Sequence, residues 1–162
     1  MGSYRDEICP YVYNVDAVSY VVDGETLDCI FNLGFDVMFK SRVKLLGIDT
    51  PDIKENVYGK LSRDALKSWV YWSINDENYN IKLEIRCPEK DSRAKFGKIL
   101  GELWVHSGID DEQNGWTNVN KWLCEHGYAI GYWNQTKNEV EEEHLKNKKI
   151  LAETGIQKLI NT

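Results

Sequence analysis

Residues 26–45 contain two runs of alternating apolar and polar side chains, and this pattern constrains the fold more than any other feature of the chain. The apolar members of the first run are Leu27, Cys29, Phe31 and Leu33. In the second run the apolar positions Val37, Phe39, Val43 and Leu45 are set against Asp36, Lys40, Arg42 and Lys44. A period of two is the period of a β-strand, and Leu33-Gly34 between the runs is typical of a turn. We therefore predict an antiparallel hairpin that buries the apolar face and exposes the charged one.

The rest of the chain adds further strands and three helices. Aromatic and β-branched runs at 11–13 and 18–22 predict the first strand, and 81–87 and 99–105 predict the fourth and fifth. Apolar residues at helical spacing predict helices over 59–74, over 119–125 after the cap Asn118, and over 138–154, ending before Gly155. This order predicts a mixed α+β, mainly β fold: an OB-fold, a five-stranded Greek-key barrel with three helices.

The composition indicates one domain. A chain of 162 residues with 42% apolar side chains suits a single core. Its longest apolar runs, such as 17–22, are much shorter than a membrane span, so we expect no membrane contact. The first residues show no apolar signal segment, which favours a cytoplasmic protein, or a secreted one if a signal has been removed. The four cysteines match no zinc spacing and are expected to be free thiols.

The charge is unevenly distributed along the chain. The net charge of −6 opposes non-specific binding of nucleic acid by the whole surface. Residues 39–67 and 80–98 are nevertheless rich in lysine and arginine, while 1–38 and 99–143 are acidic. The two basic segments form either a local phosphate-binding face or solvated strand surfaces, and charge alone favours the second alternative.

Three short polar segments lie where predicted strands end: 23–26, 44–52 and 95–98. Carboxylates and a hydroxyl group at a turn are hard oxygen ligands, which Ca²⁺ prefers. Lysines close by can neutralise a phosphate, and a carboxylate beyond the metal ligands can act as a general base on water. Each segment taken alone is an ordinary turn or strand exit, so the interpretation depends on their order and spacing.

Six motifs follow one another along the chain: Val21-Val22-Asp23-Gly24-Glu25-Thr26-Leu27, Arg42-Val43-Lys44-Leu45-Leu46-Gly47-Ile48-Asp49-Thr50-Pro51-Asp52, Tyr58-Gly59, Lys95-Phe96-Gly97-Lys98, Val119-Asn120 and Gly127-Tyr128-Ala129. In order and approximate spacing they resemble the staphylococcal nuclease family, and the segment from Glu142 to Ile156 resembles its last helix. The resemblance covers about residues 11–157. It implies an N-terminal extension (1–10), a staphylococcal nuclease-like domain (11–157) and a C-terminal tail (158–162).

The resemblance also implies a metal site that binds Ca²⁺. Glu25 and Asp49 match the positions of the family's two metal-binding aspartates. Thr50 matches the ligand that contributes its backbone carbonyl, and Asp23 would support these ligands from behind.

Further residues are implied to act on the substrate. The catalytic set would be Lys44 and Lys98, which grip and stabilise the phosphate, and Asp52, which activates or positions water. The substrate-binding set would be Lys95 and Phe96 at a nucleotide phosphate, and Tyr132 stacked on a base.

Four of the five principal positions differ from the family's residue, each by a conservative change. Glu25 replaces an aspartate, Asp52 a glutamate, and Lys44 and Lys98 two arginines. Lysine lacks the planar two-donor fork of arginine, and one methylene moves a carboxylate by about 1.5 Å. Every position keeps its charge sign, which favours a working site.

Several other side chains have alternative interpretations. Arg42 and Arg93 are close in sequence to the substituted positions and are candidates to replace a lost guanidinium group. Tyr128 and Trp133 are candidates for base stacking or for packing beside the last helix. His144 lies in a highly charged segment and is expected to be solvated.

Two functions are consistent with these observations. The first is a calcium-dependent endonuclease, a hydrolase of phosphodiester bonds in DNA or RNA, with single strands favoured, acting as a monomer at a rate below that of its relatives. The second is a catalytically impaired OB-fold module that binds single-stranded nucleic acid or a protein partner. Metal-dependent cleavage distinguishes them.

Overall fold

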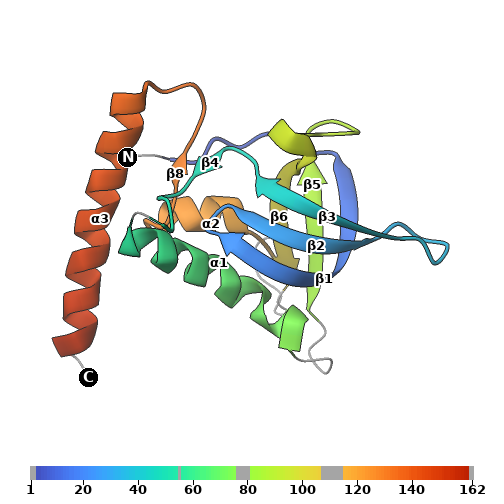
Figure 1. Cartoon of the computed structure of the whole chain (residues 1–162), viewed down its shortest axis with the longest axis horizontal. Coiled ribbons are helices and arrows are strands. Elements are labelled where there is room, and N and C mark those ends of the chain that lie inside the picture. The colour runs from blue at the N-terminus through green and yellow to red at the C-terminus, as the bar shows by residue number, and fades with distance from the viewer. Residues whose placement is uncertain (1–2, 55, 76–80, 107–114, 161–162) are drawn as a thin grey trace.

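The computed structural model describes residues 3–54, 56–75, 81–106 and 115–160, in which a closed five-stranded barrel is flanked by helices (Figure 1). Residues 1–2 of the predicted extension and 161–162 of the predicted tail lie outside this part. The strands are β1 (Tyr11–Asp23), β2 (Thr26–Asn32), β3 (Met38–Leu45), β4 (Ile48–Asp49), β5 (Lys82–Cys87), β6 (Ile99–His106), β7 (Trp116–Asn118) and β8 (Ile130–Gly131). The helices are α1 (Val57–Asn75), η1 (Lys95–Gly97), α2 (Val119–Glu125) and α3 (Lys137–Ile160). The predicted fold class is confirmed.

The barrel closes through a parallel pairing. The large sheet has the order β3-β2-β1-β5-β6-β7, and β3 also pairs with β6 in parallel, with Val43 opposite Ile99. Both sequence runs predicted for the first strand belong to β1. Its register against β2 shifts at three places, which are bulges or irregularities. Bulges bend a strand and increase its twist, so β1 can follow the curve of the barrel.

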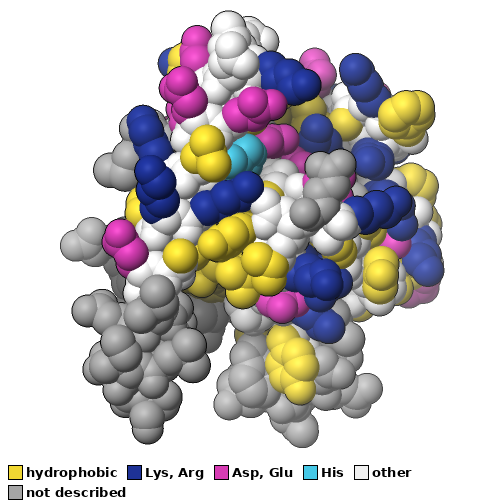
Figure 2. All heavy atoms as spheres, turned by 60° about the vertical axis from the view of Figure 1, so that its left-hand side comes forward, with side chains coloured by type: hydrophobic (Ala, Val, Ile, Leu, Met, Phe, Trp, Pro, Cys, Tyr) yellow, Lys and Arg dark blue, Asp and Glu magenta, His cyan; other side chains and the backbone are white. Residues whose placement is uncertain are grey.

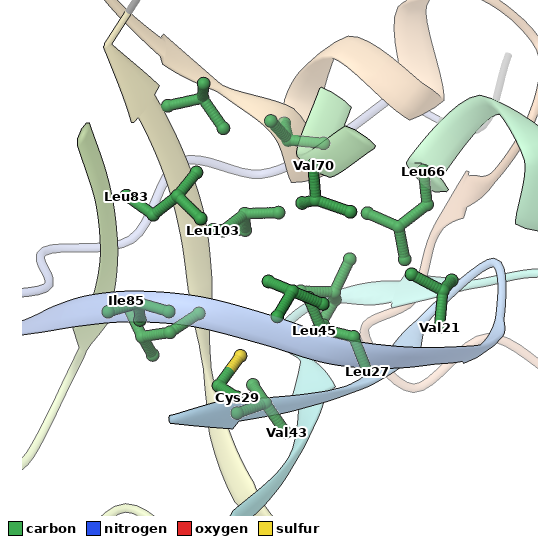
Figure 3. Packing of buried hydrophobic residues seen from close by; sticks show 14 of the residues in the cluster. Val21, Leu27, Cys29, Val43, Leu45, Leu66, Val70, Leu83, Ile85 and Leu103 are labelled. Carbon is green, nitrogen blue, oxygen red and sulfur yellow. The ribbon is translucent and has the colours of Figure 1, made fainter. Parts of the chain in front are cut away.

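The core fills the barrel and extends under α1. Figure 3 shows Leu66 and Val70 of α1 among the barrel side chains, which include Val21, Leu27 and Leu45. All five are buried. Burying a side chain of this size contributes about 1.5–3 kcal/mol, so α1 is held on the barrel by its apolar stripe.

The hairpin between β2 and β3 differs from the prediction at its outer end. The inward face is confirmed for Val43 and Leu45, which are fully buried, but not for Val37 and Phe39, which are exposed. The hairpin projects well beyond the barrel on the right of Figure 1, so its tip has no core to pack against. Alternation predicts which residues share a face but not whether another layer covers that face.

The last helix is longer than predicted. The chain was expected to leave the helix before Gly155, but α3 continues to Ile160. A glycine inside a helix costs only about 1 kcal/mol relative to alanine and does not have to end it. In Figure 1 α3 stands at the edge of the molecule, on the side of β4 and β8. No helix within the described residues is long and apolar enough to span a membrane.

Candidate active site

The turn between β1 and β2 carries the first carboxylates. The Oδ1 atom of Asp23 accepts a hydrogen bond of 2.9 Å from the backbone N–H of Glu25, which stabilises the turn. A Cβ atom on Gly24 would lie 2.7 Å from Cβ of Ser62 and 2.9 Å from Cγ2 of Thr50, so the close approach requires glycine. The turn therefore packs directly on α1 and on the residue that follows β4.

Asp49 is positioned by β4 and by the loop before it. Strand β4 pairs with β8, with Asp49 opposite Ile130. The buried amide of Asn120 donates a hydrogen bond of 2.8 Å to the Leu46 carbonyl and accepts one of 3.1 Å from the backbone N–H of Leu103. These two hydrogen bonds hold the β3–β4 loop against β6. The sequence motif contained Asn120, but its role was not foreseen, because both of its partners are distant in sequence.

Glu25 has a strongly perturbed carboxyl group. Its pKa is raised to about 8, first by burial and then by the nearby Asp49 carboxylate, while the Lys44 ammonium group opposes the shift. The Oε2 atom of Glu25 is buried and has no hydrogen-bond partner within the described residues. A buried charged oxygen without a partner is costly, so this position favours either a proton or a cation.

The residues present fit a calcium ion. The Asp49 carboxylate makes it harder for the Glu25 carboxyl group to ionise, and Glu25 has a buried oxygen without a partner within the described residues, so a cation at this centre would be stabilising. Thr50 follows Asp49 directly, and its backbone hydrogen-bonds to Glu25, so the three predicted ligands lie together. Within the described residues no group of three or more His, Cys, Asp or Glu side chains is arranged to hold a metal. A calcium ion here would therefore also need backbone or water oxygens, which Ca²⁺ accepts.

Residues from four separate segments, one of them the segment of Glu7, line one hollow of about 510 Å³, which we call the lysine hollow. Its lining includes Lys44, Lys95, Phe96, Lys98 and Tyr132. The parallel register places Lys44 opposite Leu100, two residues after Lys98, and so brings the two predicted phosphate-binding lysines to one edge. The structure thus gathers the two lysines that were predicted to be catalytic and all three residues that were predicted to contact the substrate. Figure 2 brings the side of the molecule on the left of Figure 1 forward and shows basic, acidic and hydrophobic side chains interspersed on that face.

The two aromatic residues of the lysine hollow are held outward. Phe96 is 96% exposed, and its backbone has a φ of 63°, which is strained for a residue with a side chain. Tyr132 is 50% exposed, and its backbone N–H donates a hydrogen bond of 2.8 Å to the Gly47 carbonyl. Exposed aromatic faces next to cations are suited to stacking on unpaired bases.

Asp52 lies outside the lysine hollow. It lines a second hollow of about 340 Å³, here called the Asp52 hollow, together with Asn56 of the loop and His144 and Lys148 of α3. Its side chain is exposed, and its Oδ1 atom accepts a hydrogen bond of 2.8 Å from the backbone N–H of Lys54. Asp52 is therefore on the side of the centre where α3 approaches.

The expectation that His144 is solvated is wrong. Its side chain is only 14% exposed, and its Nε2 atom lies 2.6 Å from Oδ2 of Asp49. The two residues are 95 positions apart in sequence, and α3 brings them together by docking beside β8. The charged composition of the segment concealed this contact, because composition does not say which face of a helix is covered.

Arg42 and Arg93, which were candidates to supply a guanidinium group in place of Lys44 and Lys98, bind other residues. Arg42 forms an ion pair with Asp28, with Nε 2.8 Å from Oδ1, and Arg93 donates a hydrogen bond of 2.8 Å to the Gly97 carbonyl. Neither lines the lysine hollow. The lysines therefore remain the cations of this surface.

The aromatic residues that were candidates for base stacking lie in different surroundings. Tyr128 stacks on Trp122 with ring centroids 5.8 Å apart and packs against the core. Trp133 is covered by the guanidinium group of Arg5, 3.4 Å from its ring centroid. Of the three aromatic candidates Tyr128, Tyr132 and Trp133, only Tyr132 lines the lysine hollow.

An OB-type barrel with carboxylates and lysines gathered at its strand ends defines a nuclease-like or nucleic-acid-binding domain. The family model of the staphylococcal nuclease homologues matches residues 42–156, and the chain belongs to this family. The match includes Lys44, Asp49, Asp52, Lys98 and Tyr132, and begins after the turn that carries Glu25.

A curated relative is Protein ParB from Escherichia coli, which is 27% identical over 112 residues. The alignment covers 69% of this chain and 54% of the relative, so the chain spans about half the length of the relative it matches.

Proposed function

We propose that this chain is a calcium-dependent nuclease that hydrolyses phosphodiester bonds of DNA or RNA and acts preferentially on single strands, as a monomer. The observation that supports this most directly is the lysine hollow, where Lys44 and Lys98 lie with Phe96 and Tyr132, beside the carboxylate centre of Glu25 and Asp49. Cations next to exposed aromatic rings suit an unpaired strand, which presents both phosphates and base faces.

The roles of the lysines follow from their charge and position. Lys44 and Lys98 would bind the scissile phosphate and stabilise the negative charge that develops on its oxygens. Lys95 would neutralise a neighbouring phosphate at the rim of the same hollow. Because ammonium groups are point charges without a fixed fork, we expect a rate below that of an arginine site.

The carboxylates would supply the metal site and the water. Glu25, Asp49 and the backbone of Thr50 would hold Ca²⁺, which when bound polarises a phosphoryl oxygen and helps to orient water. Asp52 would accept a proton from that water or position it. Its exposure, and its place in the second hollow, support a positioning role more than that of a buried base.

The test is digestion of heat-denatured DNA and of RNA by the purified chain, with Ca²⁺ and with a chelator. We expect cleavage that needs Ca²⁺ and falls by about a hundredfold or more in Asp49→Ala, because the site loses a charged ligand. Asp64→Ala is the matched control, since Asp64 is an exposed carboxylate on α1 outside both hollows. Metal-independent cleavage, or equal activity in Asp49→Ala, would contradict the proposal.

A second function is supported by the same surface. The substituted arginine positions and the exposed aromatic rings also suit an OB-fold module that binds single strands without cleaving them. Tight, salt-sensitive binding of single-stranded DNA, together with no turnover at high protein concentration in Ca²⁺, would select this function. Absence of both binding and turnover would favour a protein partner.

A further inference from the structure

Two polar side chains one turn apart on helix α3 make hydrogen-bond contacts with the body of the protein. His144 contacts Asp49, and the Nδ2 atom of Asn147 donates a hydrogen bond of 3.1 Å to the Ala129 carbonyl. Residues three apart lie on the same face of a helix, so both point toward the body. Only His144 of the pair reaches a residue of the carboxylate centre.

The contact between His144 and Asp49 has a defined direction. A carboxylate can only accept a hydrogen bond, so Nε2 of His144 carries the hydrogen and donates it to Oδ2 of Asp49 across 2.6 Å. The other ring nitrogen, Nδ1, is buried without a hydrogen-bond partner within the described residues. The Asp49 contact is thus the hydrogen bond that orients this ring.

Asp49 has few other local constraints on its side chain. Strand β4 has two residues, and Asp49 is its last. A carboxylate at the end of so short a strand is free to rotate about its side-chain bonds unless something holds it. Side chains that hydrogen-bond to metal ligands fix the orientation of those ligands, and their removal typically lowers metal affinity by about 10–100-fold.

We propose that His144 is a positioning residue: through its hydrogen bond it holds the Asp49 carboxylate in the orientation that binds Ca²⁺. This inference rests on the proposed calcium site. It does not require that the bound metal support cleavage, so it can hold even if the chain is not a nuclease.

The experiment measures Ca²⁺ binding by isothermal titration calorimetry on the full chain, with three variants. We expect His144→Ala to lower the Ca²⁺ affinity by about tenfold or more. His144→Gln should recover most of the affinity, because its amide offers an N–H of similar reach to Asp49. Asn147→Ala should leave the affinity within about twofold of the parent, because Asn147 anchors α3 without touching Asp49. Circular dichroism and thermal melting establish that each variant is folded.

Three outcomes would contradict the inference, and each does so in an identifiable way. Equal losses in His144→Ala and Asn147→Ala would mean that His144 acts only by docking α3. Unchanged or tighter binding in His144→Ala would mean that the imidazole does not position Asp49, or competes with the metal. No Ca²⁺ binding by the parent chain would overturn the inference and the proposed function together. Ca²⁺ binding that depends on His144, without cleavage, would overturn the nuclease alone.

Discussion

The lysine hollow and the carboxylate centre are neighbours, but they are built in different ways. The lysines lie on or next to strands β3 and β6, and the pairing of these two strands brings the lysines to one surface. The carboxylate centre joins a turn, a two-residue strand and a helix from the far end of the chain. Point charges act over several ångströms, whereas metal ligands must lie within a few tenths of one. We therefore expect the lysines to tolerate conservative exchange and the carboxylate centre to be sensitive to small shifts.

The largest effect in the lysine hollow should come from removing one of the two predicted catalytic cations. Lys44→Met or Lys98→Met should lower kcat/KM on single-stranded DNA by about a hundredfold, because a preorganised charge on the phosphate is lost. Lys44→Arg and Lys98→Arg should keep or raise the rate. Lys82→Met is the control, since Lys82 is exposed on β5 and lines neither hollow. Equal losses in all three methionine variants would show that only general charge matters.

A smaller effect is expected at Asp52, which lies on the side of α3. Asp52→Asn should lower the cleavage rate by about tenfold, less than the full contribution of a buried general base, because the side chain is exposed. Asp52→Glu should raise the rate, because the longer side chain reaches further toward the centre. The measurement is the steady-state rate at saturating Ca²⁺. An unchanged rate in Asp52→Asn would exclude Asp52 from water activation.

The carboxylate centre should also affect stability in a pH-dependent way. The folded-state pKa of Glu25 is about 8, against an ordinary value of 4.5 for a glutamate, so the folded state retains a proton that the unfolded chain loses between these values. The free energy of unfolding should therefore fall as pH rises through this window in the absence of Ca²⁺. Glu25→Gln should remove the fall and be more stable than the parent near pH 8 by about 4 kcal/mol.

Denaturant melts near pH 4.5 and near pH 8 test this difference. Near the lower pH the parent and Glu25→Gln should be close in stability, because the Glu25 carboxyl group is then largely protonated in the folded state. Ca²⁺ should stabilise the parent near pH 8 much more than it stabilises Glu25→Gln. A parent that shows no loss of stability with rising pH would contradict the buried position of this carboxyl group.

The smallest predicted effect tests whether Phe96 in the lysine hollow matters more for binding than an aromatic residue that is exposed elsewhere. Phe96→Ala should weaken binding of single-stranded DNA by about 1–2 kcal/mol, because a stacking face is lost. Phe35→Ala is the matched control: Phe35 is fully exposed and also has a positive φ of 54°, but it lies at the tip of the β2–β3 hairpin. Fluorescence anisotropy with a labelled oligonucleotide measures both. Equal losses of affinity in the two variants would indicate that the bound DNA strand also runs along the β2–β3 hairpin.

The sequence predicted most where a residue's surroundings are local. The alternation in β2 and β3 predicted the buried positions near the barrel, because strand periodicity sets which side chains share a face. It failed at Val37 and Phe39, where the hairpin extends beyond the layer that would cover them. The candidate role of Arg42 rested on its closeness in sequence to Lys44, and its cross-strand partner Asp28 binds the guanidinium group instead.

By itself the sequence determined the barrel, the membership in the staphylococcal nuclease homologues and the chemical kind of each predicted site residue. The tertiary structure decided which of these residues meet: Lys44, Lys95 and Lys98 in one hollow, Asp52 in another, and His144 on Asp49. The reason is physical. Periodicity and turn chemistry act over a few residues, whereas contacts between segments 95 residues apart depend on how helices dock, which no local pattern encodes.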